Sequence, residues 1–111
     1  MKSISNLLTT LYQQLNLIEG LNCFHYEESG DNAVPYLVWA ERGEGDSFCS
    51  SNHKQEQVIT GVCDFYTATE FDPLVDDIQT ALDEICAWKL QSVAYEDETK
   101  LIHYSWEWEL V

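Results

Sequence analysis

Positive charge is scarce in this sequence. Only 5 of its 111 residues are lysine or arginine, whereas 20 are aspartate or glutamate, so the formal net charge is −15. At short range such a surface repels nucleic-acid phosphates and has few cations with which to displace their counterions. We therefore expect no sequence-specific binding to nucleic acid. The charge leaves three uses open: a surface past which DNA slides, a mimic of DNA that occupies a basic protein site, and solubility alone.

Long apolar runs are also missing. No stretch approaches the roughly 18 to 20 residues that span a membrane, and the N-terminal sequence MKSISNLLTTLYQQ lacks the continuous apolar core of a signal peptide. We therefore expect no membrane partner and a protein that stays in the cytosol where it is made. The sequence is nevertheless 45% hydrophobic and 13% aromatic, which is enough to build the core of one domain over residues 1–111.

The four cysteines do not form a metal-binding pattern. They are widely spaced, without a C-x-x-C pair and without a histidine at ligand spacing, and stand at Cys23, Cys49, Cys63 and Cys86. We interpret them as reduced structural thiols, and we predict neither a metal nor a cofactor.

Catalytic patterns are missing as well. Glu96, Asp97 and Glu98 fall in a predicted hairpin turn, while Glu107 and Glu109 face solvent at alternate positions, where nothing separates their pKa values. No glycine pair is followed by the Lys-Ser or Lys-Thr of a phosphate-binding loop. The histidines lie far apart in the sequence, at His25, His53 and His103. We predict that the protein is not an enzyme.

Two segments have the periodicity of amphipathic helices. In the first, from Ser3 to about Asn16, apolar residues recur every three or four positions, namely Ile4, Leu7, Leu8, Leu11 and Leu15. In the second, Asp72 is a suitable N-cap and Pro73 suits the first helical position. This second helix gathers apolar residues on one side and acidic residues on the other, namely Asp76, Asp77, Asp83 and Glu84.

The rest of the chain contains strand patterns. We predict strands over residues 21–26, 36–41 and 54–66, and a hairpin that pairs residues 88–96 with 101–111. The strand over 54–66 is apolar on both faces, which predicts a central position. Residues 42–52 have no sustained periodicity and are predicted to form a long exposed loop. The order α-β-β-β-α-β-β favours an α+β fold: a mainly antiparallel sheet with both helices packed on one face.

The last predicted strand alternates aromatic and polar residues. Tyr104, Trp106 and Trp108 share one side of it. No lysine or arginine is interleaved with them, which disfavours a platform for single-stranded nucleic acid. Two interpretations remain open: these aromatic residues pack in the core, or they form a seam with a neighbouring protomer.

Several short sequences carry a family resemblance. They are P-Y-L-V at Pro35, D-F-Y-T at Asp64, T-E-F-D-P-L-V at Thr69, Y-E-D-E-T at Tyr95 and L-I-H-Y-S-W-E-W-E at Leu101. Together with the N-terminal helix, they resemble the tail-completion proteins of long-tailed bacteriophages and prophages, a group that includes tail terminators and tail-to-head joining proteins. The chain departs from similar sequences at Lys100, where glycine is frequent, so a left-handed turn conformation at this residue would be strained.

The resemblance implies a structural role in the neck of the virion. Such proteins form a ring, commonly a hexamer, that caps the tail tube and offers a docking surface to the head connector. The implied partners are further copies of the chain, the tail tube protein and head-tail connector proteins. The implied locations are the virion neck or tail and, during assembly, the host cytoplasm. Six copies of a chain with charge −15 would carry −90, and acidic residues in the bore would keep DNA from binding to the wall.

The resemblance also suggests contact residues. The segment after the second predicted strand is a candidate for reaching a neighbouring protomer or the tube, through Arg42, Glu44, Asp46 and Phe48. Candidates for the ring seam are Trp106 and Trp108. The acidic side of the second helix would line either the bore or the outer rim, through Asp76, Asp77, Asp83 and Glu84.

The main alternative is an acidic inhibitor that mimics DNA and binds a host nucleic-acid-binding protein. Its carboxylates would need to be arrayed like phosphates. Here the acidic residues are spread along an ordinary alternating pattern and are not concentrated in repeated runs, which disfavours this alternative.

Overall fold

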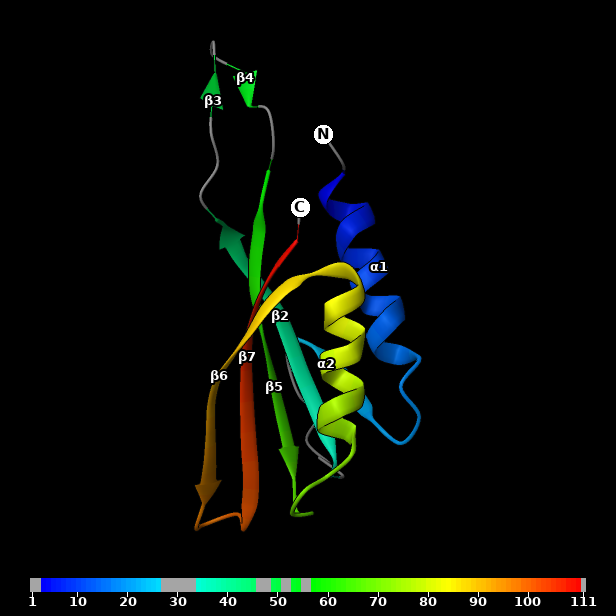
Figure 1. The fold of residues 1–111 in the computed structure, drawn as a ribbon, viewed down its shortest axis with the longest axis vertical. Coiled ribbons are helices and arrows are strands. Elements are labelled where there is room, and N and C mark those ends of the chain that lie inside the picture. The colour runs from blue at the N-terminus through cyan, green and yellow to red at the C-terminus, as the bar shows by residue number, and fades with distance from the viewer. Residues whose placement is uncertain (1–2, 27–33, 46–48, 51–52, 55–56, 111) are drawn as a thin grey trace.

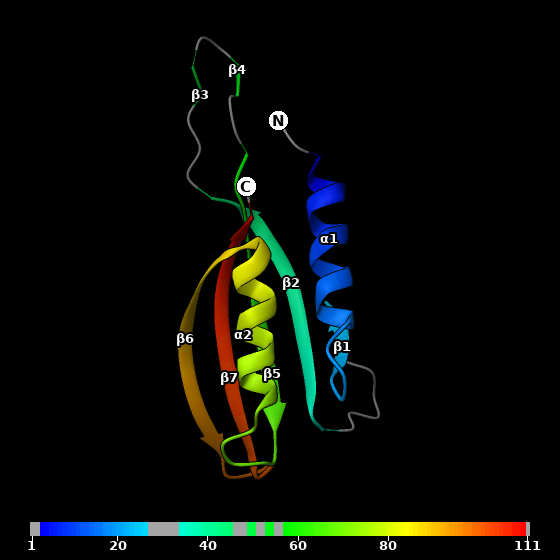
Figure 2. The same ribbon diagram turned by 45° about the vertical axis from the view of Figure 1, so that its right-hand side comes forward.

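The computed structural model describes residues 3–26, 34–45, 49–50, 53–54 and 57–110. A five-stranded sheet carries both helices on one of its faces (Figures 1 and 2). The elements in chain order are α1 (Ile4–Asn16), β1 (Asn22–His25), β2 (Tyr36–Glu44), β3 (Cys49–Ser50), β4 (His53–Lys54), β5 (Ile59–Thr67), α2 (Leu74–Ile85), β6 (Ala87–Glu96) and β7 (Leu101–Leu110). The predicted α+β class is confirmed, and apart from the short β3–β4 pair so is the order of the elements.

The spatial order of the strands is β1-β2-β5-β7-β6. All neighbours are antiparallel except β1 and β2, which run parallel. β5 lies in the middle, as the apolar character of both its faces predicts. Burial alternates strictly along it, and every second residue from Ile59 to Thr67 is buried. One face of β5 therefore belongs to the core and the other to the opposite side of the sheet.

The core lies between the helices and one sheet face. α1 contributes Leu11 and Leu15, and α2 contributes Ile78 and Leu82. These aliphatic side chains pack against large sheet residues, namely Leu37, Trp39, Phe65, Trp106 and Trp108. The buried residues of both helices are those that the helical periodicity places on the apolar side.

The start of α2 depends on Asp72. Its carboxylate accepts a hydrogen bond from the backbone N–H of Leu74 at 2.9 Å and from the hydroxyl of Thr67 at 2.6 Å. The helix begins at Leu74 with Pro73 as its N-cap, one residue later than predicted. The reason is a tight first turn, in which the N–H of Val75 bonds the carbonyl of Asp72 three residues earlier.

The predicted loop over residues 42–52 is partly wrong. β2 continues to Glu44 because residues beyond Glu41 still pair with β5, across a bulge between Glu41 and Gly43. Cys49 and Ser50 form β3, which pairs with β4 beyond the end of the main sheet (Figure 1). The strand predicted over 54–66 is also divided, because Lys54 belongs to β4 and β5 begins at Ile59. Residues 46–48 and 51–52 lie outside the described residues.

The β6–β7 turn contains the left-handed residue considered above. Lys100 has a φ of 61°, and its N–H bonds the carbonyl of Glu96 at 2.8 Å. This conformation is unfavourable for a residue with a Cβ, so lysine is strained at a position where glycine would not be.

Candidate functional site

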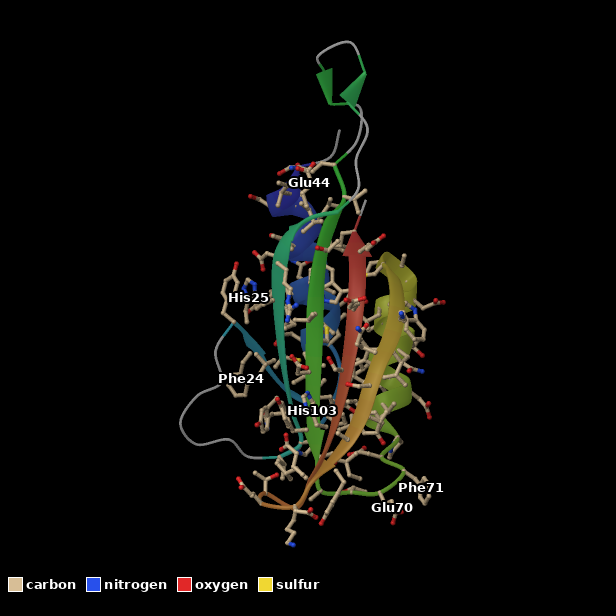
Figure 3. The ribbon with its side chains drawn as sticks, turned by 90° about the vertical axis from the view of Figure 1, so that its left-hand side faces the viewer. Phe24, His25, Glu44, Glu70, Phe71 and His103 are labelled. Atoms are coloured by element: carbon tan, nitrogen blue, oxygen red, sulfur yellow. The ribbon has the colours of Figure 1, made fainter. Side chains whose placement is uncertain are left out.

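One face of the sheet is not covered by the helices. Figure 3 looks onto this face, with α1 and α2 behind the sheet. Strand alternation and register place four residues here, because their neighbours Leu37, Phe65 and Thr67 are buried on the helix side and Phe24 is in register with Val38, two residues after Tyr36. They are Phe24, Tyr36, Tyr66 and His103. We call these four residues the aromatic row. It crosses β1, β2, β5 and β7, which are brought together only by the pairing of the strands.

The rings of the aromatic row contact one another in sequence. Tyr36 stacks on Tyr66 with ring centres 4.8 Å apart, and Tyr66 stacks on His103 at 4.3 Å. Phe24 meets Tyr36 edge to face at 6.3 Å. Tyr36 lies directly opposite Tyr66 in the register, and Tyr66 lies opposite His103. Ring pairs of this kind add stabilisation to the burial of their area.

His103 lies between two carboxylates at the end of the row. Its Nε2 is 2.8 Å from Oδ1 of Asp64 on β5, and its Nδ1 is 3.8 Å from Oε2 of Glu96 on β6. Both ring nitrogens therefore face acceptors, and the imidazole is held in one orientation. Tyr36 is only 6% exposed, so the surface of the row comes from the half-buried Phe24, Tyr66 and His103, with two carboxylates at its end.

A second group surrounds Glu41 at the end of β1. Its carboxylate lies 2.6 Å from Nε2 of His25 and accepts a hydrogen bond from the hydroxyl of Tyr26 at 2.5 Å. The His25 ring stacks between Tyr26 and Trp39 at 4.0 and 3.9 Å. Partial burial opposes ionisation of Glu41, but the hydrogen bonds from Tyr26 and His25 outweigh it and lower the pKa of Glu41. These contacts link the end of β1 to Glu41 and Trp39 of β2.

Burial makes three of the thiols difficult to ionise. Burial raises the pKa of Cys23 to about 11 and that of Cys86 to about 12. Burial, followed by the nearby Cys86 and Asp64, raises the pKa of Cys63 well above its usual range. Cys63 is buried in the core, and Cys23 and Cys86 are partly buried against it.

β2 and β5 continue past the helix-covered part of the sheet. The N–H of Gly45 bonds the carbonyl of Val58 at 2.8 Å, and the β3–β4 pair follows (Figure 1). We call the described residues 42–45, 49–50, 53–54 and 57–58 the β2–β5 extension. A shallow pocket of about 200 Å³ lies at its base, lined by Arg42, Thr60, Gly61, Val62, Glu107, Trp108 and Glu109. The extension gives the molecule its length of 52 Å, against 25 and 24 Å in the other directions.

The loop before α2 exposes a large aromatic residue. Phe71 is 87% exposed and has a φ of 56°, a conformation that residues with a Cβ rarely adopt. Figure 3 shows it pointing away from the sheet next to Glu70. Phe71 thus combines a large exposed apolar side chain with an unfavourable backbone conformation.

The predicted contact residues fall in different places. Arg42 and Glu44 are exposed on β2, within the β2–β5 extension. Asp46 and Phe48 lie outside the described residues. Trp106 and Trp108 are 0% and 1% exposed. Of the two interpretations of these tryptophans, the structure bears out core packing. Their assignment to a ring seam is wrong, because α1 and α2 cover the face on which they lie.

The acidic residues of α2 are all exposed and lie on the side of the helix that is opposite its buried residues. Asp83 accepts a hydrogen bond from the indole N–H of Trp88 on β6 at 3.0 Å, so it lies on the flank of α2 that faces β6. Asp76 is seven residues earlier and shares this flank, whereas Asp77 and Glu84 lie about 100° further round the helix. Asp76 and Asp83 thus form the edge of the acidic side that is nearer to β6, and the assignment of this side to a bore or a rim stays a prediction.

Sequence reasoning missed the aromatic row. Phe24, Tyr36, Tyr66 and His103 are far apart in the chain, and the available signal was only that each stands at an alternate position in a strand pattern. Their contact depends on the register of three strand pairs, one of them parallel. Strand register cannot be read from alternation alone, because every even shift preserves the same faces.

Comparison of the chain with models of known protein families and with curated proteins finds no match. Within the described ranges, neither helix combines the length and apolar character needed to cross a membrane. Over the same ranges, histidine, cysteine and carboxylate side chains form no group of three or more suited to a metal ion.

Proposed function

We propose that this chain is a non-enzymatic structural protein of a phage or prophage neck, which forms a ring that completes the tail tube and joins it to the head connector. The observation that carries the proposal is a pair of dissimilar surfaces on one small domain. One is the uncovered sheet face with its aromatic row, and the other is the β2–β5 extension beyond the sheet (Figures 1 and 3).

Two dissimilar surfaces favour a ring. If one surface of a protomer binds a different surface of its neighbour, the same contact can repeat from each protomer to the next, head to tail. Such a series closes into a ring if the rotation between neighbours is suitable. In this proposal the β2–β5 extension of one protomer reaches the uncovered sheet face of the next.

The sequences behind the family resemblance also contact one another in the fold. Asp64 of D-F-Y-T lies 2.8 Å from His103 of L-I-H-Y. Thr67 of the same D-F-Y-T donates a hydrogen bond to Asp72 of T-E-F-D-P-L-V at 2.6 Å. These short sequences therefore belong to one structural unit, as expected if the resemblance extends over the whole fold.

The charge of the chain is consistent with the proposed role and predicts how assembly depends on salt. Protomers of charge −15 repel one another, so their contacts depend on apolar and aromatic surface. Added salt shortens the Debye length from about 10 Å at 0.1 M to about 3 Å at 1 M. Assembly should therefore increase with salt.

The test is the solution mass by light scattering over a series of protein and salt concentrations. Each chain has a mass of 12.8 kDa, so six copies would give about 77 kDa. We expect such a species to grow with salt and protein concentration, or to form on addition of the cognate tail tube. A strict monomer or a simple dimer under all these conditions, with and without the tube, would contradict the proposal.

A deletion of residues 44–51 tests the role of the β2–β5 extension. We expect the shortened chain to keep its circular dichroism spectrum and cooperative unfolding, because the core residues lie outside the deletion. Ring formation or tube binding should be lost. The matched control is Tyr12→Ser, which changes a 52% exposed residue on α1 and should assemble normally. Normal assembly of the deletion variant would show that the extension is not the contact.

A further inference from the structure

β6 forms an edge of the sheet with little protection against pairing. Within the described ranges it pairs with β7 alone. It is 10 residues long and contains no proline and only one lysine, Lys89, although a bulge interrupts it between Leu90 and Ser92. Natural sheets usually protect an edge with charges, proline or a short strand. The outer edge of β6 is therefore suited to pairing with another extended segment.

An exposed apolar stripe follows this edge. Leu90, Val93 and Tyr95 are 40%, 52% and 58% exposed, and we call them the β6 stripe. They lie opposite Trp106, Tyr104 and Ile102 of β7, so they are on the helix-covered side of the sheet. They remain exposed because β6 runs past α2 at the edge of the sheet (Figure 2). Contiguous exposed apolar side chains of this kind mark contact surfaces.

The flank of α2 beside the β6 stripe is acidic. The indole N–H of Trp88 on β6 bonds Asp83 at 3.0 Å, and that of Trp106 on β7 bonds Gln79 at 3.1 Å, so this flank faces the β6–β7 side of the sheet. Asp76 lies on the same flank, one turn before Gln79. Lys89, the cation of β6, is in register with Glu107 and therefore lies on the other face of the sheet. The stripe thus combines apolar surface with a border of negative charge.

We propose that β6 and the adjacent flank of α2 bind an extended, basic polypeptide segment of another protein, which adds a strand along β6. Lysine or arginine side chains of that segment lay their aliphatic parts over the β6 stripe and direct their charged ends towards Asp76 and Asp83. A second copy of this chain fits less well, because it brings a charge of −15 to an acidic surface. The proposal does not depend on ring formation, since it uses neither the aromatic row nor the β2–β5 extension.

The first experiment measures the fluorescence anisotropy of a labelled peptide in which four lysines alternate with three valines, titrated with the full chain. We expect saturable binding that weakens about tenfold between low and high salt, because screening shortens the reach of the carboxylates. The same peptide with glutamate in place of lysine should not bind. Failure of the lysine peptide to bind, or equal binding of the glutamate peptide, would overturn the proposal.

Two methylated peptides test whether the segment adds as a strand. One is N-methylated on all its lysines and the other on all its valines, so each has lost the N–H groups of one edge. Strand addition uses one edge only. One peptide should therefore keep its affinity while the other loses it, and retention by both would overturn the strand geometry.

Paired variants of α2 test the charged border. Asp76→Asn with Asp83→Asn should weaken peptide binding about tenfold, since both carboxylates lie on the flank of α2 that is nearer to β6. The control, Asp77→Asn with Glu84→Gln, removes the same charge further round the same helix and should change the affinity by less than about twofold. Equal weakening by both pairs would assign the effect to net charge, and the proposed binding site beside β6 would then be wrong.

Paired variants of β6 test the apolar stripe. Leu90→Ser with Val93→Ser should weaken binding about tenfold through the loss of apolar contact. The control, Gln91→Ser with Ala94→Ser, changes the same strand outside the stripe and should bind normally. Light scattering of the same proteins reports self-association. A dimer that the stripe variants abolish, without binding of the lysine peptide, would assign the edge to a second copy and overturn the proposal.

Discussion

Gly61 shows how a single residue permits the packing of the core. The indole ring of Trp108 lies directly over it, and a Cβ at this position would overlap both that ring and the carbonyl oxygen of Ala40. Neither neighbour is the flexible end of a side chain, so the strand would have to shift. The absence of a side chain at Gly61 is therefore what allows a tryptophan to lie flat on the central strand.

This packing gives the first residue-level prediction. Gly61→Ala should destabilise the protein by about 2 to 3 kcal/mol, as expected when atoms are forced into a filled core. Urea unfolding followed by tryptophan fluorescence measures the change. The control is Gly43→Ala on the neighbouring strand, where an added Cβ meets nothing within 4 Å. That variant should stay within about 0.5 kcal/mol of the wild type. Equal stabilities of the two variants would contradict the position of Trp108.

At the scale of an element, Asp72 joins the end of β5 to the start of α2. It is 9% exposed, accepts the N–H of Leu74 and binds the hydroxyl of the buried Thr67. The carboxylate thus satisfies a free amide of the first helical turn and a buried donor at once. This contact positions α2 on the sheet, and with it the acidic flank beside the β6 stripe.

Asp72→Ala should therefore lower the free energy of unfolding by about 2 kcal/mol, through the loss of an acceptor for the N–H of Leu74 and for the buried hydroxyl of Thr67. Asp72→Asn keeps an acceptor oxygen and should lose less. The control is Asp77→Ala, an exposed carboxylate in the first turn of the same helix, where only the interaction with the helix dipole is lost, about 0.3 to 1 kcal/mol. If Asp72→Ala unfolds at the same urea concentration as Asp77→Ala, the hydrogen bonds of Asp72 add no stability beyond that of an exposed carboxylate in the first turn.

At the scale of the whole molecule, the charge of −15 opposes compactness as well as association. We expect the Tm of the monomer to rise by several degrees between low and high salt, because screening reduces repulsion among carboxylates. Thermal unfolding at a protein concentration where light scattering gives 12.8 kDa measures this directly. Near pH 4, where many carboxyl groups are protonated, the same salt step should raise the Tm less. An equal rise at both pH values would point to a salt effect unrelated to charge.

The elements and their buried sides could be predicted from the sequence because both depend on local patterns. The apolar spacing from Ile4 to Leu15 and from Leu74 to Ile85 predicts which side of each helix is buried. The apolar character of both faces of β5 predicts its central place. The end of β2 could not be predicted, since charged residues and glycine in residues 42–44 give no strand signal and their pairing depends on β5.

The candidate surfaces were much less predictable. The alternation of Trp106 and Trp108 with glutamates showed that one side of β7 is buried, but not whether helices or a neighbouring protomer cover it. Likewise, nothing in the sequence indicated that the strand residues Leu90, Val93 and Tyr95 are exposed. Whether such residues are buried depends on how far a helix extends across the sheet, which no local pattern specifies.

The sequence by itself determined the charge of the protein, the two amphipathic helices, the strand pattern and the α+β class, because these follow from composition and from periods of 3.6 and 2 residues. Tertiary structure alone decided the register that stacks Tyr36, Tyr66 and His103, and the position of α2 that buries Trp106 while leaving β6 exposed. The physical reason is that side-chain periodicity fixes the face on which a residue lies. Contacts between distant segments then select its partner on that face.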